Sequence, residues 1–470
     1  MAGRKGERVK IVATVGPASA SVRTLARLIR EGADGIRINA SHVEPDAVAP
    51  LVRRVRRAAV KAGREVAVML DLPGPKRRLG VLPEPVTLVT GQKIVLSGRK
   101  GQGRLPATLG SIVRHLKRGS RIFLKDGHIR LDVASVRGRD VHCVVGIGGR
   151  VTSRAGLNVP GVAGRGAVPT ARDKVLIEAA IAAKVDLLAL SFVQSAKDVA
   201  RCRALAPDLP VYSKIERPGA IDDLEDVARV SHGLLIARGD LAVEMPPEEL
   251  PVLQKRIVQT ANRHRRPVIV ATEMLASMVE SPRPTRAELL DVGNAVLDGV
   301  DGVMLTSETA IGKHPVQAVR VMARIVATVE KSRFQSYDLS LPGTRGEEAD
   351  RPDWALADAA VAAAFSIGAR AILAFTDSGR TARLVAAHRP SVPCFAFVAR
   401  ATARRRTALF WGVIPQKSRR LRNSNLLLRE AIAQLRRQKR LSKGDRVVAV
   451  YGSPLWKPGT RTNTVRVATV

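Results

Sequence analysis

The stretch VDLLALSFVQSAKDVARCRALAPDLPVYSKIERPGAIDDLEDVARVSHGLLIARGD (residues 185–240) contains three short apolar segments separated by two longer segments with helical patterns. The apolar segments, at 185–193, 209–216 and 233–240, have the length and composition of buried strands. An alternation of strands and helices predicts a parallel sheet with helices packed outside it. The fold class therefore depends on how many such units the chain contains.

The alternation continues on both sides of this stretch. Further strands are predicted upstream, and a helix at 21–32 has Ser21 as its expected N-cap. The strands outside the first stretch are predicted at 10–16, 34–39, 65–72, 266–274 and 301–308. Roughly eight strand–helix units close a TIM barrel, so the sequence predicts an α/β fold of that type.

Two segments interrupt or follow this pattern. After about residue 76 the chain has short strands between Gly-rich turns, which predicts an inserted β domain. A patch rich in Pro, Gly and acidic residues predicts a linker to a last α/β domain. The predicted organisation is a barrel at 1–75 and 159–339, an inserted β-barrel lid domain at 76–158, a linker at 340–353, and a C-terminal α/β domain at 354–470.

The composition limits the classes of function. The formal net charge is +36, but the basic residues are spread along the 470-residue chain and aromatic residues make up only 3% of it. We therefore expect non-specific affinity for polyanions and no specific nucleic-acid binding. No apolar stretch approaches the roughly 18–20 residues of a membrane span, and the start lacks the apolar region of a secretory signal. A cytoplasmic protein is expected, with Cys143, Cys202 and Cys394 as buried thiols.

Polar side chains recur at the carboxyl ends of the predicted strands. Lys214 and Glu216 are two residues apart, so a strand would point them to the same side. A surface ion pair of little energetic value is the alternative interpretation. The recurrence disfavours it, because chemistry in TIM barrels takes place at these strand ends. The other polar strand ends are Arg37, Asn39, Ser41, His42, Asp71, Ser191, Arg238, Asp240, Thr272, Glu273, Ser307 and Glu308.

These residue types suit phosphoryl transfer. Glu216 and Asp240 end neighbouring strands, and two carboxylates with free positions for water or substrate suit Mg²⁺ or Mn²⁺ better than zinc. Arg37 and Arg78 supply forked cations for a phosphate, and Lys214 can stabilise charge that develops on a substrate oxygen. The chain has no P-loop sequence, so a nucleotide would be held in another way.

Many segments of the chain resemble the pyruvate kinase family. They include KIVATVGPAS (10–19), IRINASH (36–42), DLPGPKRRLG (71–80), SKIE (213–216), ARGDLAVE (237–244) and the long DVGNAVLDGVDGVMLTSETAIGKHPVQAV (291–319). The resemblance implies a TIM barrel with a lid and a C-terminal domain, assembled as a homotetramer. It also implies the transfer of the phosphoryl group of phosphoenolpyruvate to ADP in glycolysis, with Mg²⁺ as cofactor.

The resemblance implies a role for each matching residue. Lys214 would stabilise the enolate and the phosphoryl group in transfer, while Glu216 and Asp240 would hold Mg²⁺. The substrate carboxylate would be held by Thr272 and by the backbone of Gly239 and Asp240. Phosphoryl binding would fall to Arg37 and Arg78, and the nucleotide would lie toward Asn39, His42 and Arg78.

A second implication concerns K⁺. Family members commonly hold this ion with an Asn, a Ser, an Asp and a Thr carbonyl, and the matching positions are Asn39, Ser41, Asp71 and Leu72. Lys76 stands where K⁺-dependent members carry Glu, which resembles the K⁺-independent branch. A fixed ammonium there would replace the ion, so little K⁺ requirement is expected.

One departure from the family leaves alternatives open. The lid lysine expected to reach the nucleotide phosphates is Ala155. There are therefore two alternatives to a kinase. One is a non-catalytic paralogue that binds phosphoenolpyruvate or polyanions. The other is another metal-dependent enolpyruvate enzyme, such as a lyase or aldolase.

The C-terminal domain contains a possible effector site. The segment at 376–381 joins a predicted strand to a helix, where backbone amides can hold a phosphate. In the family, sugar-phosphate effectors bind at this place. The residues concerned are Thr376, Ser378, Gly379, Arg380 and Thr381, and a helix cap without a ligand is the alternative.

Overall fold

The computed structural model describes residues 8–75, 77–98, 103–107, 109–125, 127–161, 167–332, 352–457 and 459–470. Its centre is a closed barrel of eight parallel strands in the order β1-β17-β16-β15-β14-β13-β3-β2, which confirms the TIM barrel. The strands are short and buried on both faces, as expected for a parallel sheet covered by helices. They are β1 (Lys10–Val15), β2 (Gly35–Asn39), β3 (Ala67–Asp71), β13 (Leu187–Leu190), β14 (Val211–Ile215), β15 (Gly233–Ala237), β16 (Val268–Ala271) and β17 (Gly302–Leu305).

Helices connect these strands on the outside of the barrel. Ser21 caps the first one, because its side chain accepts a hydrogen bond from the Thr24 N–H, as the sequence predicted. Thr170 and Thr285 begin two others with capping boxes. The helices are α1 (Val22–Glu31), α2 (Pro45–Ala62), α3 (Ala171–Ala182), α4 (Ala196–Leu205), α5 (Pro218–Asp222), α6 (Leu224–Val230), α7 (Arg238–Glu244), α8 (Leu250–Arg263), α9 (Arg286–Leu297), α10 (Ser307–Ala310) and α11 (Pro315–Glu330).

In the described part of the segment between β3 and α3, nine strands form the β insert. Seven of them make one sheet in the order β4-β12-β8-β9-β10-β6-β7, and β11 pairs with β5. They enclose a separate apolar core that includes Ala155. The strands are β4 (Arg77–Arg78), β5 (Val86–Leu88), β6 (Lys93–Ser97), β7 (Arg104–Pro106), β8 (Arg121–Leu124), β9 (Ile129–Arg137), β10 (Asp140–Ile147), β11 (Gly149–Val151) and β12 (Gly156–Asn158).

The C-terminal part is an α/β unit with a five-stranded sheet in the order β20-β19-β18-β21-β22, in which only β22 is antiparallel. Residues 340–351 of the predicted linker lie outside the described residues, and 352–353 belong to the first helix of this unit. Its elements are α12 (Pro352–Ser366), β18 (Ala371–Thr376), α13 (Arg380–Ala387), β19 (Cys394–Val398), α14 (Ala401–Thr407), β20 (Val413–Lys417), α15 (Ser424–Arg437), β21 (Arg446–Tyr451) and β22 (Thr464–Thr469).

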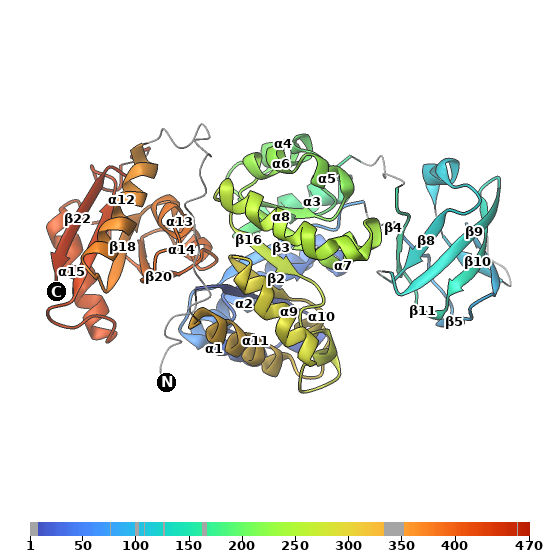
Figure 1. The fold of residues 1–470 in the computed structure, drawn as a ribbon, viewed down its shortest axis with the longest axis horizontal. Helices are drawn as coiled ribbons and strands as arrows, with labels where there is room; N and C mark the ends of the chain where they lie inside the picture. The colour runs from blue at the N-terminus through green and yellow to red at the C-terminus, as the bar shows by residue number, and fades with distance from the viewer. Residues whose placement is uncertain are drawn as a thin grey trace.

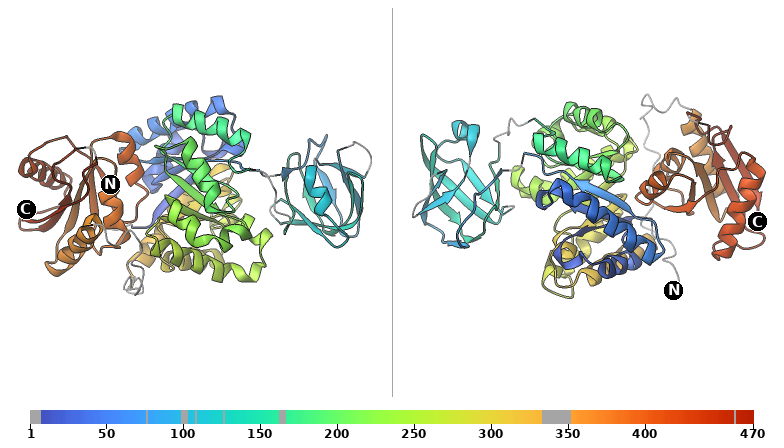
Figure 2. Two further views of the ribbon diagram at one scale, coloured as in Figure 1. Left: turned by 90° about the horizontal axis from the view of Figure 1, so that it is seen from above. Right: turned by 180° about the vertical axis from the view of Figure 1, so that it is seen from behind.

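The barrel lies between the other two units in all three views (Figures 1 and 2). The β insert leaves the barrel after β3, so it stands at the carboxyl ends of the strands. The C-terminal unit meets the opposite rim, where Leu409 joins the apolar cluster inside the barrel and would touch a Cβ placed on Gly35. The C-terminal unit therefore closes one end of the barrel. A site can lie only at the other end, which faces the insert.

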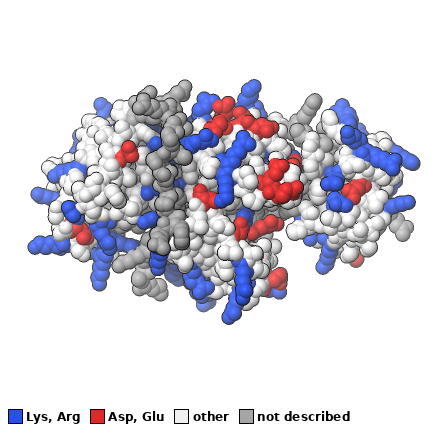
Figure 3. All heavy atoms as spheres, viewed as in Figure 1, with Lys and Arg blue, Asp and Glu red and all other residues white. Residues whose placement is uncertain are grey.

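The surface and the thiols agree with the composition. Lys and Arg side chains are scattered over the visible face of all three units instead of forming one stripe (Figure 3). Cys143, Cys202 and Cys394 are free and buried, and burial raises the pKa of each thiol to about 12. Among the described residues, no helix is long and apolar enough to cross a membrane.

Candidate active site

Lys214 lies at the centre of a buried polar network at the carboxyl ends of the barrel strands. Its Nζ is 2.7 Å from Oε1 of Glu216 and 3.3 Å from Oδ1 of Asp71. It also donates a hydrogen bond of 2.9 Å to Oγ of Ser191, which in turn donates to Asp71. Three strands, β3, β13 and β14, therefore place polar groups around one ammonium.

Arg37 enters the same network from β2. Its Nε and Nη2 lie 2.7 Å and 2.6 Å from Oδ2 of Asp71, and its Nη1 donates to Oγ1 of Thr14 at 3.2 Å. Asp71 is therefore shared by two cations, Arg37 and Lys214. The two carboxylate oxygens of Asp71 thus hold the guanidinium of Arg37 and the ammonium of Lys214 close together. Both cations lie at the open end of the barrel.

The electrostatics of the network favour ionised side chains. Burial raises the pKa of Asp71, but the charges of Lys214 and Arg37 outweigh it and the pKa is lowered. Burial lowers the pKa of Lys214, but the carboxylates of Asp71 and Glu216 outweigh it and the pKa is raised. Lys214 thus stays protonated at neutral pH and presents a positive charge in a site of low dielectric constant.

Glu216 and Asp240 fit a divalent cation. Glu216 is fully buried, its Oε2 accepts the Phe192 N–H at 2.8 Å, and its Oε1 has no hydrogen bond although it is ion-paired with Lys214. Burial raises the pKa of Glu216, and the nearby charge of Asp240 raises it further against the effect of Lys214. A cation between the two carboxylates would relieve that repulsion. Within the described residues no cluster of three or more His, Cys, Asp or Glu side chains could hold a metal, so water and substrate would complete its ligands.

Thr272 and Gly239 lie side by side at the neighbouring strand ends. Oγ1 of Thr272 accepts the Gly239 N–H at 2.7 Å, and Asp240 follows in the first turn of α7. Thr272 has a φ of 71°, a left-handed conformation that is costly for a β-branched residue. Thr272 and the start of α7 are therefore held together at this strand end.

The residues predicted for the nucleotide lie at the rim beside Arg37. Oδ1 of Asn39 accepts the Ser41 N–H at 3.2 Å and caps a 3-10 turn at Ala40–His42. Partial burial lowers the pKa of His42, and the charges of Arg78 and Arg37 lower it further. His42 is therefore neutral at pH 7 and lies close enough to both arginines for their charges to act on it.

The remaining predicted positions are Leu72, Arg78, Ala155 and Lys76. Leu72 is fully buried, and its N–H donates to the Ala189 carbonyl. Arg78 belongs to β4 of the insert, and its Nη1 donates to the carbonyl of Arg154 in the same unit at 3.1 Å. Ala155 packs in the core of the insert. Lys76, the predicted replacement for K⁺, lies outside the described residues.

The predicted effector segment is not part of this site, because it belongs to the C-terminal unit at the other end of the barrel (Figure 1). Its amides are bound within the segment, since Thr376 Oγ1 accepts the Gly379 N–H at 3.0 Å and Ser378 Oγ accepts the Arg380 N–H at 3.4 Å. The Arg380 side chain pairs with Asp353 at 2.7 Å, and the Thr381 hydroxyl lies 2.9 Å from that of Thr462.

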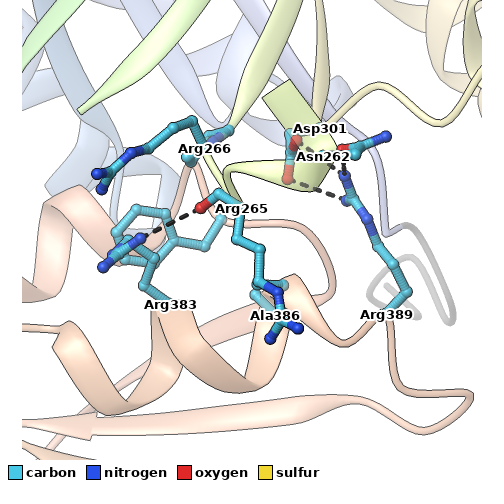
Figure 4. A pocket seen from close by; sticks show the side chains of 10 residues that line it. Asn262, Arg265, Arg266, Asp301, Arg383, Ala386 and Arg389 are labelled. Atoms are coloured by element: carbon cyan, nitrogen blue, oxygen red, sulfur yellow. Dashed lines mark hydrogen bonds and ion pairs between the residues drawn. The ribbon is translucent and has the colours of Figure 1, made fainter. Parts of the chain in front are cut away.

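A narrow hollow between the barrel and the C-terminal unit is lined by arginines (Figure 4). Arg389 forms two bonds of 2.9 Å with the carboxylate of Asp301, the residue before β17, and Nη1 of Arg383 donates to the Arg265 carbonyl. These contacts lie at the amino ends of the strands, opposite Lys214. They join the two units and bring none of the predicted site residues together.

Sequence reasoning missed parts of the network. Ser191 was noted as a polar strand end, but its bridge between Lys214 and Asp71 was not predicted. Thr14 was not identified at all. The available signal was a hydroxyl inside the otherwise apolar strand KIVATV, where it is buried and bonds the Leu305 carbonyl.

Comparisons with known proteins show the family to which the chain belongs. Residues 6–319 match the family described as "Pyruvate kinase, barrel domain", and residues 354–468 match "Pyruvate kinase, alpha/beta domain". The chain is similar to a pyruvate kinase of Agrobacterium vitis, at 38% identity over 99% of this chain and 98% of the relative. It is also similar to those of Corynebacterium glutamicum, at 38% identity over 97% and 96%, and Thermococcus litoralis, at 37% over 98% of each chain. The chain belongs to the pyruvate kinase family of phosphotransferases.

Proposed function

We propose that this chain transfers the phosphoryl group of phosphoenolpyruvate to ADP, giving pyruvate and ATP in glycolysis. The observation that carries the proposal is the buried network of Lys214, Glu216, Asp71 and Arg37 at the open end of the barrel. Cations fixed around a site without a nucleophile–base pair suit phosphoryl transfer, where positioning and charge neutralisation dominate.

Each residue has a proposed part in the reaction. Arg37 and Arg78 bind and orient the phosphoryl group, and Thr272 with the backbone of Gly239 and Asp240 holds the substrate carboxylate. The ammonium of Lys214 stabilises the negative charge that develops on the enolate oxygen as the phosphorus–oxygen bond breaks. The enolate then takes up a proton at its methylene carbon to give pyruvate.

Glu216 and Asp240 would hold Mg²⁺ or Mn²⁺. When bound, such an ion would supply positive charge that neutralises phosphoryl oxygens. We place the ADP beside Asn39, His42 and Arg78 at the rim, with the β insert above it. Lys76 replaces K⁺ in this proposal, so K⁺ is not required.

The wider setting of the enzyme follows the family. We propose a cytoplasmic homotetramer, with a phosphate-bearing effector at 376–381 and no specific nucleic-acid partner. Its three functional units are those predicted above, with the lid at 76–158 and the C-terminal domain at 354–470. Sedimentation of the purified protein tests the tetramer.

The test of the reaction is product identification by ³¹P nuclear magnetic resonance after incubation with phosphoenolpyruvate, ADP and Mg²⁺. The proposal predicts that the phosphoenolpyruvate signal disappears as the signals of ATP grow, only when ADP is present. Binding of phosphoenolpyruvate without turnover would instead support the non-catalytic paralogue suggested by Ala155. Consumption without ADP, with carbon–carbon products, would support a lyase or aldolase.

A further inference from the structure

A buried ion pair lies directly behind the two proposed metal carboxylates. Nη1 of Arg217 is 2.8 Å from Oε1 of Glu244, and their side chains are only 12% and 2% exposed. Arg217 directly follows Glu216 in sequence. Glu244 lies four residues after Asp240 in α7, about one helical turn away. The ion pair therefore joins the two chain segments that carry the two carboxylates.

Arg217 also supports Glu216 through a second residue. Its guanidinium carbon lies 4.7 Å from the centre of the Phe192 ring, and the Phe192 N–H is the donor to Oε2 of Glu216. Phe192 has a φ of 59°, so its amide direction depends on an unusual backbone conformation that contacts must maintain. Arg217 thus contacts both the helix behind Asp240 and the residue whose N–H orients Glu216.

The β insert approaches α7 beside the same ion pair. Nearby, a Cβ on Gly127 of the insert would lie 3.2 Å from Val243, the neighbour of Glu244. In Figure 1, α7 lies on the side of the barrel that faces the insert.

We propose that Arg217 and Glu244 form a clamp that positions Glu216 and Asp240 for a divalent cation. Both are positioning residues, because neither touches the reacting atoms. The clamp rests on the proposed function in that it assumes a metal between Glu216 and Asp240. Residues behind metal ligands typically change metal affinity by about 10–100-fold when they are replaced.

The test is Mn²⁺ binding to the full chain without substrates, measured by electron paramagnetic resonance of free Mn²⁺. Arg217→Met removes the charge and keeps most of the side-chain length, and should raise the Mn²⁺ Kd at least about tenfold. Arg217→Lys, which keeps a cation near Glu244, should recover most of that loss.

The matched control is Arg389→Met, which breaks the buried pair with Asp301 at the opposite rim of the barrel. It loses a comparable ion pair, so it should keep the wild-type Mn²⁺ Kd. Glu244→Gln keeps the volume of the side chain and removes the other charge of the clamp. If Arg217→Met does not fold, the Mn²⁺ Kd of Glu244→Gln tests the clamp instead.

The outcomes separate this inference from the proposed function. Wild-type protein that binds no Mn²⁺ would contradict the metal site and with it both proposals. Wild-type binding with an unchanged Kd in Arg217→Met and Glu244→Gln would overturn the clamp alone. An equal loss in Arg389→Met would also overturn it, because the effect would then be one of general stability.

Discussion

Nζ of Lys214 lies 2.7 Å from Oε1 of Glu216, the residue directly after strand β14. One strand end therefore delivers both a cation and a proposed metal ligand to the same small volume. The pairing with Asp71 and Ser191 holds the ammonium in place before any substrate arrives. Such preorganisation lets a charged group act on the transition state without a cost of reorientation.

Replacing Lys214 by Met should lower kcat by at least about 100-fold, because the lost charge acts mainly on the transition state. KM for phosphoenolpyruvate should change much less, since Arg37 and Thr272 still bind the ground state. Steady-state kinetics give both constants. A variant with wild-type kcat would show that Lys214 has no catalytic part, and a thermal melt checks that the change leaves the protein folded.

Replacing Lys76 by Glu should make the enzyme depend on K⁺. The variant removes the ammonium that we propose takes the place of K⁺, and it introduces the Glu that K⁺-dependent family members carry at this position. Rates with K⁺ and with Na⁺, at constant ionic strength, measure the effect. Equal rates of the variant in the two salts would show that Lys76 does not take the place of K⁺.

Glu330 predicts a pH dependence of stability. Its Oε1 accepts the N–H groups of Arg8 and Val9 at 2.6 Å each, its Oε2 is buried without a hydrogen bond, and burial raises its pKa to about 7. The folded state therefore favours the protonated acid. Stability should fall as the pH rises from the ordinary glutamate pKa of about 4.5 to about 7, by up to about 3 kcal/mol, and then stay level.

Glu330→Gln should remove this dependence. The variant should melt at a higher temperature than the wild type at pH 8 and at the same temperature near pH 4.5. Thermal unfolding followed by circular dichroism at the two pH values makes the comparison. A variant that is less stable than the wild type at pH 8 would mean that Glu330 is charged and stabilising in the folded protein.

Asp186 should stabilise the junction between the barrel and the C-terminal unit. It is fully buried, accepts the Val68 N–H at 2.8 Å, and pairs with Arg56 at 2.6 Å and Arg405 at 2.9 Å. Asp186→Asn leaves two partly buried arginines without a carboxylate, which typically costs about 3–5 kcal/mol.

Asp226→Asn is the control for that variant, because its pair with Arg229 is exposed and should contribute at most about 1 kcal/mol. Thermal unfolding of both variants makes the comparison. Equal melting temperatures of the two variants would show that the contacts of Asp186 add no more stability than an exposed ion pair.

The sequence allowed the local parts of this structure to be predicted. Strand alternation places Lys214 and Glu216 on one side, and the count of strand–helix units leads to the barrel. Contacts between distant residues could not be derived in this way. Arg405 and Asp186 are 219 residues apart, and Arg217 meets Glu244 because α7 follows β15, the strand that pairs with β14. Such pairs have no fixed spacing in the sequence, so only the folded chain shows them.

The most direct test of the account is the initial rate of pyruvate formation from phosphoenolpyruvate and ADP with Mg²⁺, in Na⁺ and in K⁺ at constant ionic strength. The account predicts ADP-dependent turnover that is similar in the two salts. Turnover only in K⁺ would contradict the role of Lys76, while the proposed kinase activity would still stand. No turnover in either salt, with phosphoenolpyruvate still bound, would contradict the central claim that this barrel end is a working phosphotransferase site.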